Sequence, residues 1–162
     1  MMESERQHGI NLRKEGKLQE SNQLFSMLLR ASPNDAFLNY QYAWSFDARG
    51  EESKAVPYYE RAIDLGLSGK ELEGAIVGLG STFRALGEYE KSKGIFVKGL
   101  ELFPDNRAIQ VFYSMTLHNL NEHQKAMEIV LSCLTETTSD EEILNYRKAI
   151  NFYKDKLNDI WK

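Results

Sequence analysis

Small and large apolar residues recur at helical spacing on either side of several short turns. At one of these turns, Leu79, Gly80 and Phe83 precede the turn, and Ser92, Phe96 and Gly99 follow it. Spacings of three and four residues place side chains on one face of a helix, whereas a half-buried strand would show strict alternation. The pattern therefore predicts an all-α chain built from helical hairpins.

The turns themselves repeat. Each is centred on a glycine or asparagine, at Gly16, Gly50, Gly87 and Asn121, with intervals of 34, 37 and 34 residues. Self-similarity at a fixed period of this length is typical of a stacked array of repeats.

The packing rows alternate in size. Two helices approach closely when a small residue on one admits a bulky side chain from the other. The expected small positions are Gly9, Ala43, Gly80 and Ser114. The expected inserted side chains are Phe25, Tyr59, Phe96 and Val130.

A longer motif accompanies this alternation. The segment Ile76-x-x-Leu79-Gly80-x-x-Phe83 matches the pattern Trp-x-x-Leu-Gly-x-x-Tyr, and Ser92-x-x-x-Phe96 and Pro104 follow at the expected distances. In these residues the chain resembles the tetratricopeptide repeat family, over residues 3–137. It looks like the small stand-alone bacterial members, some of which act as dimers. The resemblance implies a right-handed α-α superhelix, or solenoid, of about four hairpins.

The predicted boundaries follow from the turns. We expect a single domain with repeats at about 2–35, 36–69, 70–106 and 107–138, and a capping helix at about 140–161. The longer second interval reflects three extra residues within 65–71. The first helix of the third repeat should therefore begin early and be longer than its counterparts.

The expected capping helix carries an apolar stripe at alternating spacings of three and four: Ile143, Tyr146, Ile150, Tyr153, Leu157 and Ile160. We expect this stripe to cover the exposed core at the end of the fourth repeat, because repeat arrays need an end cap. Leu144 and Phe152 fall off the stripe. They are either scattered exposed apolar residues or, with Trp161, a contact with a second copy of the chain.

Composition narrows the possible partners. The chain is 42% hydrophobic and 27% charged, which is enough apolar content for a folded core. Its net charge of −4 provides no basic surface for nucleic acid. The polar N-terminus leads into no secretory signal, and no apolar run approaches the length of a membrane span. We expect a soluble, cytoplasmic protein with neither a nucleic-acid nor a membrane partner.

The residues that could carry chemistry do not combine into a site. His8, His118 and His123 lack the spacing of a helical zinc site, and His118 is either a polar surface residue or part of a groove. The glycine-rich stretch 74–80 lacks the last glycine and the preceding strand of a phosphate loop. Cys133 falls on a packing row, which predicts a buried, inert thiol. We therefore expect no catalytic residue, no metal and no cofactor.

The resemblance also implies where a partner binds, because the first helix of each repeat in this family lines the concave face. The corresponding residues here are Arg6, Ile10, Arg13, Tyr40, Trp44, Asp47, Val77, Ser81, Arg84, Phe112, Met115 and His118. On the second repeat, Tyr42, Ala43 and Phe46 already occupy the packing rows of the helix. Tyr40 and Trp44 point about 100° or more away from those rows, so we expect them to be exposed in the groove.

Some family members grip a C-terminal carboxylate with a set of lysines, asparagines and an arginine. The matching positions here are Arg6, Ile10, Gln41, Gly74 and Gly78, and only Arg6 keeps the charge. We expect an amphipathic helix or an aromatic-bearing segment instead. The leading hypothesis is a non-enzymatic scaffold that binds a protein segment. The alternatives are a homodimer built through the C-terminal helix and a peptide- or ligand-sensing regulator.

Overall fold

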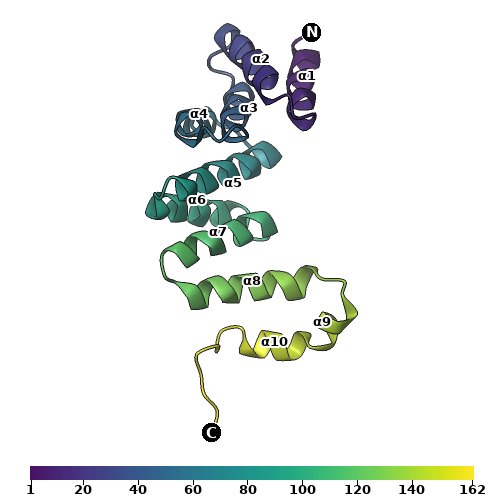
Figure 1. Cartoon of the computed structure of the whole chain (residues 1–162), viewed down its shortest axis with the longest axis vertical. Coiled ribbons are helices and arrows are strands. Elements are labelled where there is room, and N and C mark those ends of the chain that lie inside the picture. The colour runs from purple at the N-terminus through teal and green to yellow at the C-terminus, as the bar shows by residue number, and fades with distance from the viewer. The chain divides into compact units, whose positions relative to one another are not determined.

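The chain forms ten helices and no strand, which confirms the predicted fold class. The structure is a computed structural model that describes all residues, 1–162. The helices are α1 (Met2–Lys14), α2 (Leu18–Ala31), α3 (Ala36–Asp47), α4 (Glu52–Asp64), α5 (Gly69–Ala85), α6 (Tyr89–Leu102), α7 (Arg107–Asn119), α8 (His123–Thr137), α9 (Glu141–Asn145) and α10 (Arg147–Tyr153) (Figure 1). They form two compact units, residues 1–88 and 89–162, which are described separately. None of the ten helices has both the length and the apolar character that a membrane span requires.

In the first unit, consecutive helices pack against one another from α1 to α5, and α3 also contacts both α1 and α5. Phe25, Leu29 and Leu38 form a buried cluster between α2 and α3. Apolar side chains from α1 and α4 pack around this cluster, which joins the first hairpin to the second.

Glycines admit the large side chains of this unit. A Cβ atom added at Gly9 would lie 2.7 Å from the ring of Phe25, as the alternation of small and large residues predicts. A Cβ atom at Gly78 would lie 2.5 Å from the ring of Tyr59, and one at Gly74 would collide with the hydroxyl group of Tyr40. Close approach of aromatic rings to α5 therefore depends on two residues without side chains.

The central residues of the four repeated turns have a left-handed backbone conformation. Gly16, Gly50, Gly87 and Asn121 have φ angles of +79°, +71°, +78° and +62°. In the longer second interval, Gly66 follows α4 with a φ of +89° and ends it. α5 then begins at Gly69 and has 17 residues, which confirms the early start and greater length expected of this helix.

The second unit contains α6 to α10, and α7 packs against both α6 and α8. Phe96, Ile109 and Leu117 are fully buried in its core. The hydroxyl groups of Ser92 and Thr116 are hydrogen-bonded at 2.8 Å, which satisfies two buried polar groups between α6 and α7.

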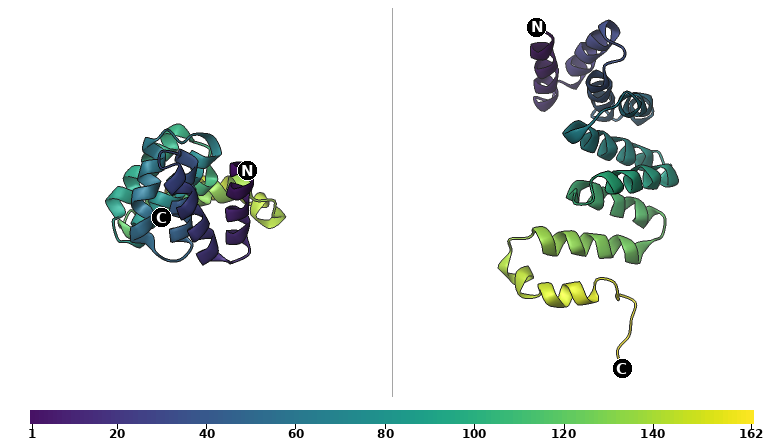
Figure 2. Two further views of the ribbon diagram at one scale, coloured as in Figure 1. Left: turned by 90° about the horizontal axis from the view of Figure 1, so that it is seen from above. Right: turned by 180° about the vertical axis from the view of Figure 1, so that it is seen from behind.

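The expected capping helix at 140–161 is wrong as a single element. The segment forms two short helices, α9 and α10, with a break at Tyr146, and the chain continues as a tail that leaves α10 (Figure 2). Asn, Asp and aromatic residues are frequent here and have low helix propensity. A short helix also needs tertiary packing to be stable, and this segment finds little of it.

The packing of α10 also explains why the prediction of a buried Val130 is wrong. α10 lies beside α8, where Asn151 accepts a hydrogen bond from Thr135 at 3.0 Å and Lys154 donates one to Ser132 at 3.0 Å. These contacts are polar, so the apolar face of α8 stays uncovered. Val130, which the alternation placed inside the core, is 37% exposed, and Met127 and Leu134 are exposed beside it.

Candidate functional site

Trp44 lies at the centre of the candidate site, on α3. The carboxylate of Asp35 caps this helix by accepting a hydrogen bond from the backbone N–H of Leu38 at 2.9 Å. The cap fixes where the helix begins, so Ala43 and Phe46 turn into the core and Trp44 turns away from it. Trp44 is 42% exposed, as its position off the packing rows predicts.

Arg13, on α1, lies against Trp44. Its guanidinium carbon is 4.0 Å from the centroid of the Trp44 ring, within the range of a cation–π interaction. Its Nη2 atom donates a hydrogen bond to the side-chain oxygen of Gln41 at 2.6 Å, whereas its Nη1 atom is buried and has no acceptor. Arg13 is partly buried, and this burial lowers its pKa.

The prediction that Tyr40 is exposed in a groove is wrong, because its side chain is only 6% exposed. Its ring centroid lies 5.8 Å from that of Trp44, and its hydroxyl group fills the space that Gly74 leaves on α5. Burial raises the pKa of Tyr40 to about 12. Tyr40 is therefore a buried support under Trp44, made possible by a glycine on the next helix.

Asp47 lies one turn after Trp44 and is tied to the interior. Its carboxylate accepts a hydrogen bond from the hydroxyl group of Tyr59 at 3.1 Å. Burial raises the pKa of Asp47, and the hydrogen bond from Tyr59 opposes that shift. Burial also raises the pKa of Tyr59, so this hydroxyl group stays protonated and donates. Asp47 is thus a partly buried member of the site.

The remaining predicted residues of α1 lie apart from Trp44. The guanidinium group of Arg6 pairs with the carboxylate of Asp35 and lies 5.1 Å from the ring centroid of Phe37. Ile10 packs against the buried cluster around Phe25 instead of facing a groove. Both residues therefore have structural partners within the first unit.

On α5, the predicted residues Val77, Ser81 and Arg84 are all partly buried. The hydroxyl group of Ser81 donates a hydrogen bond to the carbonyl oxygen of Gly78 at 3.0 Å. The structure thus brings together Arg13, Tyr40 and Trp44 from the predicted set. Sequence reasoning missed the role of Gln41 as the hydrogen-bond acceptor for Arg13. The available signal was its place three residues before Trp44, on the same face of the helix.

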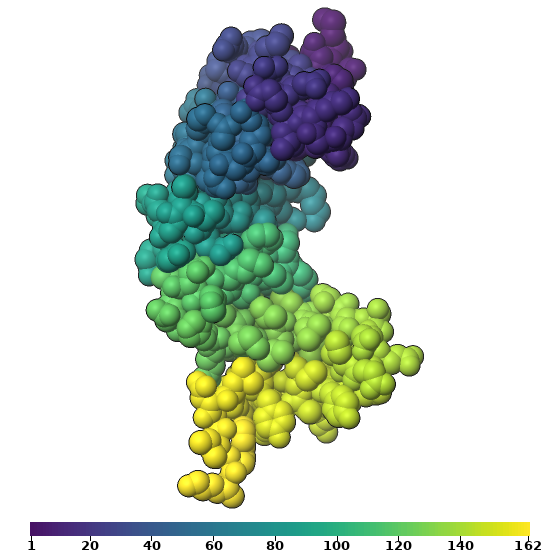
Figure 3. All heavy atoms as spheres, viewed as in Figure 1, coloured from purple at the N-terminus to yellow at the C-terminus, as the bar shows by residue number.

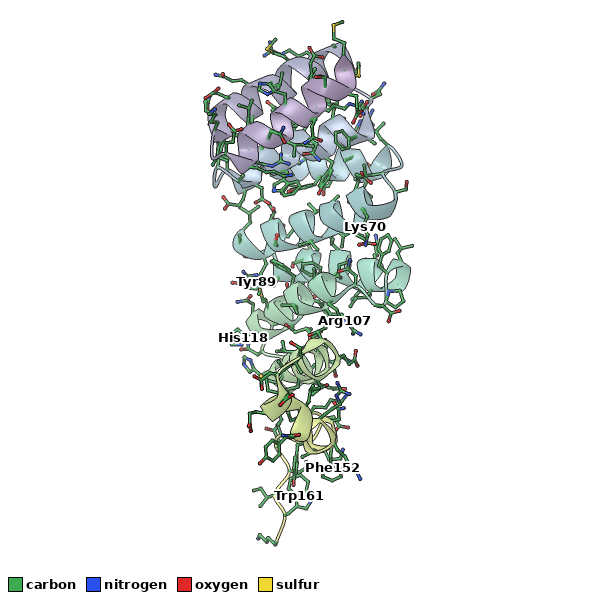
Figure 4. The ribbon with its side chains drawn as sticks, turned by 90° about the vertical axis from the view of Figure 1, so that its right-hand side faces the viewer. Lys70, Tyr89, Arg107, His118, Phe152 and Trp161 are labelled. Atoms are coloured by element: carbon green, nitrogen blue, oxygen red, sulfur yellow. The ribbon has the colours of Figure 1, made fainter.

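The second unit holds the other predicted groove residues, on α7. Phe112 is partly buried and Met115 is exposed. His118 is exposed near the end of α7 (Figure 4), where its Nδ1 atom lies 3.2 Å from Nδ1 of His123 across the turn. No group of three or more His, Cys, Asp or Glu side chains comes together as a metal site.

Cys133 is buried, as its packing row predicts. Its thiol donates a hydrogen bond to the side-chain oxygen of Gln110 at 3.0 Å. Burial raises the pKa of Cys133, which keeps the thiol protonated and weakly nucleophilic.

Two of the residues proposed for a dimer contact, Phe152 and Trp161, lie near each other at the C-terminal end (Figure 4). With Tyr153 they form an exposed aromatic cluster, in which ring centroids lie between 5.1 and 6.3 Å apart and each side chain is about half exposed. The tail that carries Trp161 protrudes beyond α10 in the space-filling view (Figure 3). Leu144, on α9, is partly buried.

Helical hairpins that recur every 34 to 37 residues, with glycine or asparagine turns and small-to-large packing between helices, define a helical repeat protein. The family model described as tetratrico peptide repeat matches residues 36–157. The chain therefore belongs to the tetratricopeptide repeat family. Members of this family are generally non-enzymatic modules for protein interactions.

Relatives and solved structures agree with this assignment. Superkiller protein 3 of Saccharomyces cerevisiae is 26% identical over 91 residues, which cover 56% of this chain and only 6% of that protein. The structure of the MamA RS-1 ArsTM double mutant has a TM-score of 0.74 at 13% sequence identity, and the match covers 97% of this chain and 86% of the MamA chain. YrrB, described as a TPR protein with an unusual peptide-binding site, has a TM-score of 0.69 at 14% identity, and the match covers 94% of this chain and 80% of the YrrB chain. These two structures share the fold with this chain.

Proposed function

We propose that this chain is a non-enzymatic scaffold that binds a segment of a partner protein on the first-helix face, with Trp44 as the central contact. The observation that supports this most is the exposed indole of Trp44 with the Arg13 guanidinium group 4.0 Å from its ring centroid. Tryptophan and arginine contribute a large share of binding energy at protein interfaces. In this proposal the chain is cytoplasmic and its partner is a protein or peptide, with neither nucleic acid nor membrane involved.

The proposed contacts lie on the first helices of the repeats and are given for each unit separately. In the first unit they include the partly buried α5 residues Val77, Ser81 and Arg84. The equivalent residues of the fourth repeat are Phe112, Met115 and His118. The peptide-binding site of YrrB, a protein of the same fold, supports this use of the fold.

Trp44→Ala tests the proposal when it is compared with Met27→Ala as the control. Met27 is 66% exposed on α2, away from the first-helix face, so both variants remove one exposed apolar side chain. We expect affinity capture with the purified chain to lose its specific partner with Trp44→Ala and to keep it with Met27→Ala. Circular dichroism checks that both variants are equally helical. Undiminished capture by Trp44→Ala would show that the partner binds elsewhere.

A second candidate function is homodimerisation through the C-terminal segment. Two apolar surfaces in the second unit are uncovered: the α8 stripe of Met127, Val130 and Leu134, and the aromatic cluster of Phe152, Tyr153 and Trp161. The occupant that fits both at once is a second copy of the chain, because each copy supplies the surface that the other leaves open.

Sedimentation velocity tests the dimer. We expect the wild type to show a concentration-dependent dimer that is lost when Phe152 and Trp161 are both replaced by serine. Leu102→Ser is the control, since Leu102 is exposed at the end of α6 and outside both surfaces. A wild-type chain that stays monomeric at all concentrations rules this candidate out.

A further inference from the structure

Arg13 forms no ion pair with a carboxylate, although its guanidinium group is partly buried. Three arginines form ion pairs with an acidic side chain: Arg6 with Asp35, Arg49 with Glu51 and Arg107 with Glu136. The contacts of Arg13 are instead a neutral amide, that of Gln41, and two aromatic rings, those of Trp44 and Phe25. Its charge is therefore uncompensated.

The surroundings of Arg13 strengthen its attraction for a carboxylate. Burial lowers its pKa, and the neighbouring tyrosine hydroxyl groups of Tyr40 and Tyr59 oppose the shift only in part. Its Nη1 atom is buried without a hydrogen-bond acceptor. A partly desolvated cation with an unused donor attracts a carboxylate more strongly than the same group in bulk water, because the local dielectric constant is lower.

We propose that the partner segment carries a carboxylate that pairs with Arg13, next to an apolar or aromatic side chain that packs on Trp44. This inference rests on the proposed function, since it names the chemistry of the segment bound at Trp44. The guanidinium group of Arg13 has five N–H donors, and one of them donates a hydrogen bond to Gln41. The remaining donors include some that can bind a carboxylate.

In this proposal Trp44 shifts when the carboxylate binds to the buried donor. The Trp44 ring lies over the guanidinium group and is 42% exposed, whereas Gln41 and Tyr40 beside it are buried and held in place. Trp44 is therefore the neighbour that shifts most readily. Binding of the carboxylate should change the environment of the indole, which provides a spectroscopic readout of its own.

The carboxylate has two possible sources, an Asp or Glu side chain and the C-terminus of the segment. The probe that separates them is a display library of random twelve-residue peptides with free C-termini, selected on the purified full chain. Selected peptides are then synthesised in three forms: unchanged, with acidic side chains replaced by their amides, and with an amidated C-terminus. Affinities are measured by fluorescence anisotropy for the wild type, Arg13→Gln, Arg13→Lys and Trp44→Ala.

We expect one of the two neutralised peptides to bind the wild type about 10-fold more weakly, which is the usual size of a lost charge-assisted hydrogen bond. The same neutralisation should have no effect on Arg13→Gln, and Arg13→Lys should recover part of the binding because it keeps the charge. In a Trp161→Phe background, where Trp44 is the only indole, the unchanged peptide should shift the tryptophan emission.

The outcomes separate this inference from the proposed function. If selected peptides need Trp44 but bind equally well in all three forms, the carboxylate inference is wrong and the proposed function stands. If no peptide is selected, or selected peptides ignore Trp44→Ala, both are overturned. Because the comparison of peptide forms uses the wild-type chain, it decides the question even if Arg13→Gln does not fold.

Discussion

Two glycines on α5 give two tyrosines of the first unit their positions. Gly74 leaves room for the hydroxyl group of Tyr40, and Gly78 leaves room for the ring of Tyr59. A buried Tyr40 supports Trp44 from below, and Tyr59 donates a hydrogen bond to Asp47. The chemistry of the candidate site thus depends on residues that have no side chain of their own.

Gly78→Ala should destabilise the chain, because the new methyl group would lie 2.5 Å from the Tyr59 ring. Overpacking of this kind costs about 1–3 kcal/mol, which we expect as a fall in the free energy of unfolding by urea. Gly94→Ala is the matched control, since Gly94 lies within α6 and a Cβ atom there meets nothing within 4 Å. That variant should be stabilised by up to about 1 kcal/mol through helix propensity. Equal effects of the two substitutions would contradict the packing described here.

Asp47 gives the first unit a pH dependence with a definite sign. Its folded-state pKa is raised by burial, so the folded chain binds the proton more tightly than the unfolded chain. Its contribution to stability is therefore largest at acid pH and falls as pH rises through its unfolded and then its folded pKa. Asp47→Asn keeps an acceptor for Tyr59 but does not titrate.

We expect the free energy of unfolding of the wild type, relative to Asp47→Asn, to decline as pH rises across the acid range. Urea titrations of both proteins from pH 3 to pH 7 measure this difference, and the other carboxylates cancel because both proteins share them. A difference that stays flat or grows with pH would show that Asp47 is not held as described.

At the scale of elements, the turns determine where the helices end. Gly50 has a φ of +71°, a conformation that costs an L-residue about 1–2 kcal/mol. Asn121 occupies the equivalent turn with a φ of +62° and already bears part of that cost. Gly50→Ala should therefore lower the melting temperature, whereas Asn121→Gly should leave it unchanged or raise it. The opposite order would mean that the two turns are not equivalent.

The sequence was sufficient to predict the helical hairpins, because the small-to-large rows and the turn residues are local signals that agree with one another. Gly9 against Phe25 and the early start of α5 are confirmed examples. The break in the C-terminal segment was not predictable from the sequence, because its apolar stripe indicates one continuous helix. The break depends on how little the segment packs against α8, which only the structure shows.

The candidate site was predictable only in part. The exposure of Trp44 followed from its place off the packing rows, but Tyr40 lies off the same rows and is buried. The difference comes from Gly74, which is 34 residues later in the chain and whose contact with Tyr40 is not visible in helical periodicity. The unpaired charge of Arg13 likewise depends on which neighbours surround it in three dimensions.

At the scale of the whole molecule, the two proposed functions use uncovered surfaces on separate units. Partner binding uses the surface centred on Trp44 in residues 1–88, and dimerisation uses the α8 stripe and the aromatic cluster in residues 89–162. Each is tested by its own variants, so loss of one function leaves the other measurable. Binding of a partner and dimerisation are compatible because they use different residues.

The most direct measurement places a photo-crosslinking amino acid at position 44 in living cells. Benzoyl-phenylalanine keeps an aromatic ring in place of Trp44, and the same residue at position 27 on α2 serves as the control. Irradiation should join the chain to a discrete protein from position 44 and not from position 27. Absence of a product at position 44, or the same product from both positions, would contradict the claim that a partner binds over Trp44.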